Sequence, residues 1–464
     1  MGATTGARTA AATSFWLEGL EQPATDPVRG EVHADVLVVG GGYTGLWTAL
    51  ALVEANPSLQ VVLCEAQTVG FGASGRNGGF CEPSLAHGLA NGLRHFPDEV
   101  RELEALGDAN FKAIQDFLEA SGVDCDFEAN GTIDLAVADW QVEDLRELAE
   151  LYARFGQRAV LLDADEVADR VRSPMVRAGL ERPDGGAVLH PGKLALGLRR
   201  VALERGITVH ERSPVTGLRV EDGAVVGDVP EGIVRADRAV VATNAYSAGV
   251  LRATRRHFVP VHDHVLVSEP LSASQMAAIG WSGRQGLSDA GNQFHYFRLT
   301  ADDRILWGGY DAIYLYGGGL EEDPVDVAIV QRRLRAHFAQ MFPPLADLAF
   351  PYAWSGPIAT TTRFTPVFGS GLGGRVHYAL GYTGLGVAAS RFAGQVLAAR
   401  LTDPASPLLR LRYTTAAPFP FPPEPVRWAG VQLVRRAIAR SDARGGRRGP
   451  LLGALDRIGI GFDS

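Results

Sequence analysis

A glycine-rich junction near the start of the chain, within Ala34 to Ala66, constrains the fold more than any other feature. The uninterrupted apolar run Val36 to Val39 predicts a buried strand, and the glycines that follow predict a tight turn into a helix. Gly40, Gly42 and Gly45 form G-x-G-x-x-G, a pattern that allows a sharp bend, close backbone approach to a pyrophosphate and tight packing of helix on strand. The phosphates would then face a helix N-terminus, where unpaired N–H groups and the helix dipole stabilise negative charge.

A second apolar strand, Gln60 to Cys64, ends at Glu65 and completes this unit. A carboxylate in that place can accept hydrogen bonds from both ribose hydroxyls, whereas it would repel a 2′-phosphate. A glycine triplet alone is also compatible with a plain turn, but the flanking strand, helix and acid favour a dinucleotide site. The unit does not separate FAD from NAD, so that choice depends on the rest of the chain.

The size and charge of the chain exclude several classes of protein. Its 464 residues suggest two or three domains, and its net charge of -9 gives no reason to expect nucleic acid as a partner. Three cysteines without C-x-x-C or zinc spacing predict reduced thiols in a cytoplasmic protein and no metal site. No run of about 18 apolar residues is present, and Met1 to Ala12 looks like a frayed tail rather than a signal peptide.

A second glycine-rich block, Ala66 to Phe80, follows the ribose acid directly. Its five glycines within AQTVGFGASGRNGGF indicate backbone that lies close to something flat or charged, although a flexible surface loop is the alternative. Ser74 and Asn77 could donate hydrogen bonds to phosphate or ring oxygens, and Arg76 could neutralise phosphate charge.

A second domain is expected from segments with a different pattern. Helical spacing at Glu99 to Ala120 and Val142 to Phe155 flanks an alternating strand, Gly131 to Ala138. Longer strands follow after Arg256, including a hairpin in which Tyr296 and Arg298 face opposite to His295, Phe297 and Leu299, with Asp302 and Asp303 in its turn. Such a polar and aromatic face is compatible with either a ligand pocket or plain core.

The strand-glycine-helix pattern recurs near the other end of the core chain. Val376 to Leu380 predicts a strand, and Gly381, Gly384 and Gly386 then open a helix that extends to Leu401. NAD-dependent domains have no use for a second glycine-gated helix start. Flavoproteins do, because charge that accumulates on the reduced ring must be stabilised.

Beyond Pro404 the sequence predicts an extended proline-rich linker, a short amphipathic helix at Trp428 to Ile438 and a basic stretch at Arg435 to Arg448. Two interpretations remain open for this tail. It either docks on its own protein or contacts a membrane surface or partner.

Together these segments resemble the FAD-dependent D-amino acid oxidase superfamily and, within it, the γ-glutamylputrescine oxidase-like branch. The resemblance covers Ser14 to Leu401 and is carried by ADVLVVGGGYTGLWTALAL, EAQTVGFGASGRNGGF, LHPGKLALGLRRVALERG, VVATNAYS, and WSGPIATTTRFTPVFG with GYTGLGVAASRFAG. It implies an α/β fold in which a Rossmann-type, glutathione-reductase-like FAD domain carries an inserted α+β substrate domain with a mixed sheet. The implied FAD domain comprises residues 33–90, 180–255 and 356–405, the substrate domain 91–179 and 256–355, and the linker and tail 406–464.

The resemblance also implies which residues hold non-covalent FAD. They are Gly40, Gly42, Tyr43, Thr44 and Gly45 at the pyrophosphate, Glu65 and Ala66 at the ribose, Ala73, Ser74, Gly75, Arg76, Asn77, Gly78 and Gly79 beside the pyrophosphate and flavin, Val215 at the adenine, and Gly384, Leu385, Gly386 and Val387 at the pyrimidine side of the ring. Some members attach flavin covalently, but Cys81 and His87 after the glycine block are better explained as a buried thiol and a surface histidine.

The expected substrate site is less sharply defined. The chain has Pro357 where family members often carry a basic residue, so Arg363 or Arg298 would have to bind a carboxylate, and Tyr296 and Trp354 are candidate pocket walls. The leading hypothesis is oxidation of a C–N bond in a primary amine such as a γ-glutamylated polyamine, by hydride transfer to flavin N5 and imine hydrolysis, with oxygen or another carrier as electron acceptor. The alternatives are a secondary or D-amino acid substrate, and a non-catalytic flavin-binding module that assembles with a partner.

Overall fold

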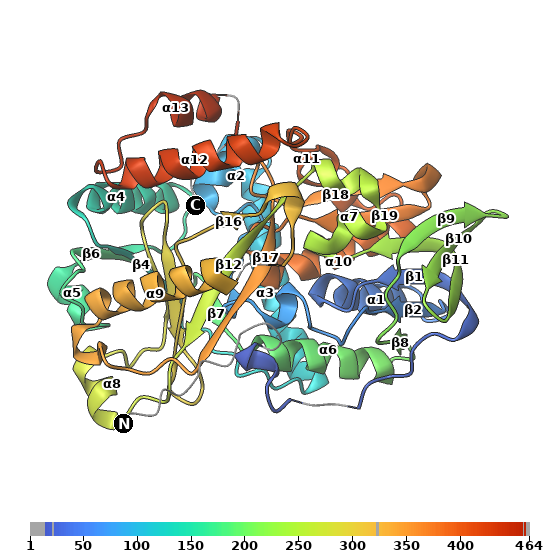
Figure 1. Ribbon diagram of the computed structural model, residues 1–464, viewed down its shortest axis with the longest axis horizontal. Coiled ribbons are helices and arrows are strands. Elements are labelled where there is room, and N and C mark those ends of the chain that lie inside the picture. Colours follow the sequence, from blue (N-terminus) through green and yellow to red (C-terminus); the bar gives the residue numbers. More distant parts are fainter. Residues whose placement is uncertain (1–13, 21–22, 322–323, 458, 461–464) are drawn as a thin grey trace.

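The computed structural model describes residues 14–20, 23–321, 324–457 and 459–460, so the expected frayed tail at Met1 to Ala12 lies outside the described residues. Two large sheets lie side by side, each with helices against it (Figure 1). Among the described helices, none combines the length and apolarity needed to cross a bilayer.

The first sheet has eight strands in the order β18-β19-β11-β1-β2-β8, with β10 and β9 added as a hairpin extension of β11. Its centre is parallel, because β1 pairs in parallel with both β2 and β11. The strands are β1 (Gly30–Val39), β2 (Val61–Cys64), β8 (Thr208–His210), β9 (Gly217–Glu221), β10 (Ala224–Val229), β11 (Gly232–Val241), β18 (Val367–Gly371) and β19 (Val376–Leu380).

Alternation along β1 explains why both faces of this sheet are covered. Val36 and Val38 pack into the core beneath the helices, whereas Leu37 and Val39 belong to a separate core on the opposite face. The helical side is formed by α1 (Tyr43–Ala55), α3 (Val100–Ser121), α6 (Pro191–Glu204) and α10 (Gly386–Thr402). This confirms the predicted strand-glycine-helix units at both ends of the core chain.

The second sheet is mixed and has nine strands in the order β16-β12-β15-β14-β13-β4-β6-β5, with β17 on the other side of β12. Helices α8 (Ala273–Ile279) and α9 (Pro324–Met341) share an apolar core with one face of it. The strands are β4 (Thr132–Ala136), β5 (Val160–Asp163), β6 (Ala178–Arg182), β12 (Val259–Val267), β13 (Gly286–Asp289), β14 (His295–Leu299), β15 (Ile305–Gly309), β16 (Ile313–Tyr314) and β17 (Tyr352–Thr360).

Strand pairing shows which sheet each segment near the expected domain boundaries belongs to. The expected boundaries at residues 180 and 356 fall inside β6 and β17, and both strands pair along their full length within the second sheet. Strand β9 begins at Gly217, and Val215 before it lies in an irregular segment beside the cavity described below.

The remaining elements connect the two halves. A two-stranded ribbon pairs β3 (Phe80–Cys81) with β7 (Ala187–Val188), and α2 (Leu89–His95) follows β3 along the chain. Helices α4 (Asp139–Arg154) and α5 (Ala164–Ala168) cover the β4–β6 region, and α7 (Ser247–Val250) follows β11. The tail forms α11 (Arg412–Thr415), α12 (Val426–Asp442) and α13 (Pro450–Arg457), and α12 and α13 run along the upper edge of the molecule in Figure 1.

Candidate functional site

One large cavity of about 1790 Å³ is lined by both sheets and by the tail. Most residues predicted to hold the cofactor line it, namely Gly40, Gly42, Tyr43, Thr44, Glu65, Ala66, Ala73, Ser74, Arg76, Asn77, Gly78, Val215, Gly384, Leu385, Gly386 and Val387. Gly45, Gly75 and Gly79 do not, because each packs against backbone behind the wall: a Cβ there would lie 1.9, 2.3 and 2.3 Å from a carbonyl oxygen. The cavity therefore brings together segments from both ends of the core chain.

The N-terminus of α1 opens into this cavity. Gly42 is its N-cap and makes no side-chain cap hydrogen bond, whereas the N–H of the next residue, Tyr43, donates to Ser74 Oγ at 2.9 Å. Gly40 has φ +111°, a conformation that L side chains rarely adopt, and a Cβ on Gly42 would lie 2.9 Å from Ser74 Oγ. The first turn of α1 thus presents backbone N–H groups that suit a phosphate.

Glu65 lies at the end of β2, at the same edge of the sheet. Its two carboxylate oxygens accept hydrogen bonds from Gly41 N at 2.7 Å and Gln67 N at 2.9 Å. Burial raises the pKa of Glu65, while these two N–H donors oppose the shift. Each oxygen keeps a second lone pair, so the carboxylate can still accept hydroxyl protons from a ribose.

The N-terminus of α10 opens into the same cavity. Its N-cap is Leu385, which likewise receives no side-chain cap from the described part of the chain, and Gly384 has φ +97° with nothing within 4 Å of the place that a Cβ would take. A hydrogen bond of 2.7 Å between Thr44 and Tyr382 joins the two helix starts. The two glycine-gated N-termini therefore share one space, which fits the elongated shape and two charged regions of FAD.

The second glycine-rich block is a wall of the cavity held by its own side chains. Asn77 Nδ2 donates to Ala73 O and Ser74 O, both at 3.0 Å, and Asn77 Oδ1 accepts from Gly79 N at 2.8 Å. Arg76 donates to Phe71 O and Ser355 O, which ties the block to β17. These bonds exclude the alternative of a flexible surface loop.

Tyr296 lines the cavity next to the second glycine-rich block, where a Cβ on Gly78 would lie 2.6 Å from its ring. Its hydroxyl donates a short hydrogen bond to Asp263, and both residues line the cavity. Burial raises the pKa of the Asp263 carboxyl, against the opposing effect of that hydrogen bond. Sequence reasoning missed Asp263, although its place between His262 and His264 in an alternating strand put it on the opposite face from both.

Three other predicted substrate contacts do not line the cavity. Trp354 is 1% exposed and donates through Nε1 to Arg76 O at 2.8 Å. Arg298, 1% exposed, donates to the carbonyls of Leu189, Gly79 and Leu299, while Arg363 donates to Thr365 Oγ1 and to the carbonyls of Ala416 and Pro366. Because their hydrogen-bonding groups hold the backbone together, Trp354, Arg298 and Arg363 are structural residues rather than the substrate contacts expected from the sequence.

The candidates for covalent attachment lie in different surroundings. Cys81 is fully buried with a free thiol outside the cavity lining, and burial raises its pKa well above the ordinary range. His87 lines the cavity, lies 3.0 Å through Nε2 from Thr383 O, and has its pKa lowered to about 4 by burial. His87 is thus a wall residue near the α10 turn rather than the surface histidine expected from the sequence.

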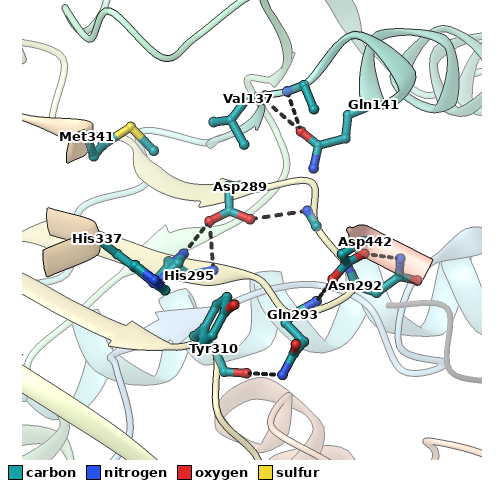
Figure 2. Close-up of polar contacts among 12 residues, drawn as sticks. Val137, Gln141, Asp289, Asn292, Gln293, His295, Tyr310, His337, Met341 and Asp442 are labelled. Carbon is teal, nitrogen blue, oxygen red and sulfur yellow. Dashed lines mark hydrogen bonds and ion pairs between the residues drawn. The ribbon is translucent and has the colours of Figure 1, made fainter. Parts of the chain in front are cut away.

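The tail roofs the cavity and docks on its own protein. Asp442 at the end of α12 accepts hydrogen bonds from Asn292 Nδ2 at 2.5 Å and Gln293 N at 3.0 Å, as Figure 2 shows. Asn292 and Gln293 belong to the loop that joins β13 to β14. At its base, Asp289 at the end of β13 accepts a hydrogen bond from Nδ1 of His295 at the start of β14, at 2.6 Å. Residues of the linker, α12 and α13 line the cavity, among them Phe421, Val434 and Leu455. This roof shields one end of the cavity from water.

Within the described ranges, no group of three or more His, Cys, Asp or Glu residues is arranged to hold a metal ion. The residues present do fit FAD: two glycine-gated helix N-termini, a carboxylate with free lone pairs for ribose hydroxyls and backbone without Cβ atoms lie along one cavity.

Comparisons with known proteins agree with this assignment. Residues 35–400 match the DAO family, described as FAD dependent oxidoreductase. Gamma-glutamylputrescine oxidoreductase from Escherichia coli is 32% identical over 398 residues, which cover 85% of this chain and 90% of that protein. A probable oxidoreductase, OrdL, from Haemophilus influenzae is 29% identical over 393 residues, covering 83% of this chain and 87% of that protein. The crystal structure of glycine oxidase from Geobacillus kaustophilus shares the fold, with a TM-score of 0.68 at 19% identity and coverage of 82% of this chain and 98% of that one. The chain therefore belongs to the DAO family of FAD-dependent oxidoreductases.

Proposed function

We propose that this protein oxidises a C–N bond of an amine at the end of the cavity that carries Asp263 and Tyr296. The observation that carries the proposal is a buried carboxylate that faces the cavity beside a hydroxyl, while Pro357 occupies the wall position where the family often has a basic residue. A carboxylate there suits a protonated amine, and its burial favours pairing with a cation.

Bound FAD supplies an acceptor for the hydride that leaves the carbon next to nitrogen. An ammonium must first lose a proton before the nitrogen lone pair can assist that departure, and Asp263 is placed to accept the proton. Tyr296 holds the Asp263 carboxylate in position through its hydroxyl. Water then adds to the resulting imine to release an aldehyde or keto product and ammonia or a smaller amine.

The chain's similarity to gamma-glutamylputrescine oxidoreductase supports a γ-glutamylated diamine or a related primary amine as substrate. The fold shared with glycine oxidase supports a secondary or D-amino acid as the alternative. In the former case the nitrogen-bearing carbon carries no carboxylate, which agrees with Pro357 and with the two candidate arginines lying outside the cavity lining.

The test is anaerobic addition of amines to the purified yellow protein. We expect bleaching of the flavin band by γ-glutamylputrescine or a related primary amine, and peroxide or reduction of an added acceptor once turnover is allowed. Bleaching by sarcosine, glycine or D-alanine alone would favour the amino acid alternative. A yellow protein that no amine bleaches would contradict the enzyme and favour a flavin-binding assembly module.

A further inference from the structure

A second charged cluster lines the same cavity on strands remote from Asp263, and the proposed chemistry does not use it. It consists of Glu82, which follows β3, Asp134 on β4 and Arg182 on β6. Arg182 Nη2 lies 3.4 Å from Glu82 Oε2, and Arg182 Nε lies 4.0 Å from Asp134 Oδ2. The side chains are mostly buried, with 15% of Arg182, 20% of Glu82 and 25% of Asp134 exposed.

The charges in this cluster are not balanced. Two carboxylates share one guanidinium, and a third, that of Glu104 on α3, interacts electrostatically with the same Arg182. Burial raises the pKa of Glu82, which shows that Arg182 does not fully offset the cost of placing that carboxylate here. The cluster therefore holds more carboxyl groups than cations, and Glu82 and Asp134 among them line the cavity.

Several polar atoms of the cluster also lack partners. Within the described residues, Arg182 Nε, Thr132 Oγ1 and Glu104 Oε1 are buried without a hydrogen bond. Thr132 is 5% exposed and lines the cavity directly opposite Arg182 in the β4–β6 register. A buried polar group without a partner costs stability, so the unpaired Thr132 hydroxyl in the cavity wall favours a ligand that donates a hydrogen bond to it, as an ammonium does.

The strand register places this cluster at a defined distance from the proposed reaction site. Asp134 pairs with Ser288, whose hydroxyl donates to it at 2.5 Å, and Ser288 pairs with Tyr296. Paired residues project from the same face, and strands lie about 4.8 Å apart, so Asp134 and Tyr296 are separated by about 10 Å along the sheet. Asp263 lies on β12, two strands further on, but its carboxylate accepts a hydrogen bond from the Tyr296 hydroxyl, so Tyr296 marks the near edge of the reaction site.

We propose that Glu82, Asp134 and Thr132, with Arg182 holding the two carboxyl groups in position, form a second subsite, which binds an ammonium group at the end of the substrate remote from the oxidised carbon. This inference rests on the proposed amine oxidation and specifies its substrate as an amine with a second, distant cation. A four-carbon diamine, with five bonds of about 1.5 Å each, is too short to reach both sites. A longer polyamine or an acylated diamine whose acyl group carries an α-ammonium meets the requirement.

The test compares substrates that differ only in the remote ammonium. One pair is γ-glutamylputrescine and glutarylputrescine, which lacks the α-amino group; the other is spermidine and N-propylputrescine, which lacks the amino group at the end of the propyl arm. In Asp134→Asn and Glu82→Gln holoenzymes we expect kcat/KM for the ammonium-bearing member to fall about 10- to 100-fold. For the member that lacks it, kcat/KM should change less than about threefold. The pair that responds identifies the source of the ammonium.

Glu143→Gln on the exposed surface of α4 is the matched control, since its carboxylate pairs with Arg146 on the same helix and is 61% exposed. Asp134→Asn keeps an oxygen for Ser288, so its flavin content and melting temperature should stay near wild type. Calorimetric titration with spermidine and with γ-glutamylputrescine, and with glutarylputrescine as the control that lacks the remote ammonium, gives a readout that does not require turnover.

The outcomes separate the two proposals. If spermidine or the conjugate binds in a manner that depends on Asp134 and Glu82 but no amine bleaches the flavin, amine oxidation is wrong and the subsite stands. If amines bleach the flavin and both members of each pair respond equally to the substitutions, the subsite is overturned and amine oxidation stands.

Discussion

The two ends of the cavity are built in different ways. At the cofactor end, the contacts within the first glycine-rich unit join residues close in sequence, such as Gly41 to Glu65, 24 positions apart, and Tyr43 to Ser74, 31 apart; the distant contact of Thr44 with Tyr382, 338 apart, joins this unit to the second helix start. At the substrate end the decisive contacts are distant: Glu82 to Arg182 spans 100 positions, Asp134 to Ser288 spans 154, and Asn292 to Asp442 spans 150. A short motif can specify a phosphate site by itself, whereas the substrate site exists only once strand register and tail docking are set.

The largest effect is expected at the cofactor end. Gly42→Val places a branched side chain where even a Cβ would lie 2.9 Å from Ser74 Oγ. The side chain should fill the space in front of the α1 N-terminus and prevent binding of the pyrophosphate, so the purified protein should be colourless. Flavin content per chain and far-ultraviolet circular dichroism measure binding and folding separately. Gly217→Val is the control, because nothing lies within 4 Å of a Cβ there. A yellow Gly42→Val protein would contradict the assigned pyrophosphate site.

At the substrate end, Asp263→Asn removes the proposed proton acceptor while it keeps a partner for Tyr296. We expect kcat/KM to fall about 100-fold with flavin content unchanged. Tyr296→Phe should cost less, about tenfold, because the carboxylate remains but loses its fixed orientation. Stopped-flow measurement of flavin reduction at several pH values checks both variants. Wild-type reduction rates in Asp263→Asn would rule out Asp263 as the proton acceptor.

A smaller effect is expected at the roof. Asp442→Asn removes the charge from hydrogen bonds that hold α12 on the loop between β13 and β14 (Figure 2), so the tail should open more often. We expect about tenfold faster proteolysis of the linker at residues 416–425 and an increase in KM of a few fold, with flavin content retained. Asp403→Asn, on an exposed turn, is the control. Equal proteolysis rates would show that Asp442 does not hold the roof.

The smallest effect concerns pH. Burial lowers the pKa of His87 to about 4, from an ordinary value of 6.5, so the unfolded chain binds a proton that the folded protein excludes between these values. His87 therefore lowers the melting temperature of the flavin-free protein as pH decreases from 6.5 towards 4, whereas buried carboxyls with a raised pKa, such as Glu65 and Asp263, act in the opposite direction. His95, His190 and His377 shift in the same direction, so His87→Gln should reduce the slope without removing it. An unchanged slope would mean that His87 titrates normally in the folded protein.

The cofactor half was predictable because each of its parts has a local physical cause. The apolar run of β1, the glycines before α1 and α10 and the acid after β2 were all located from their spacing, and the structure confirms these elements. Arginines were the least predictable residues. A guanidinium can bind a ligand carboxylate or several carbonyls equally well, and at Arg298 and Arg363 the carbonyls of other segments were the partners.

The sequence by itself determined the two glycine-gated helix starts, the ribose acid and hence the flavin fold, since turn conformation, helix polarity and apolar periodicity act over a few residues. Only the tertiary structure decided that Asp263 and Tyr296 face the cavity, that Glu82, Asp134 and Arg182 meet there, and that the tail covers it. The reason is that strand register and tail docking depend on which side chains, distant in sequence, can be buried together. The free energy gained by this burial arises from a pair of segments in contact and cannot be assigned to either segment alone.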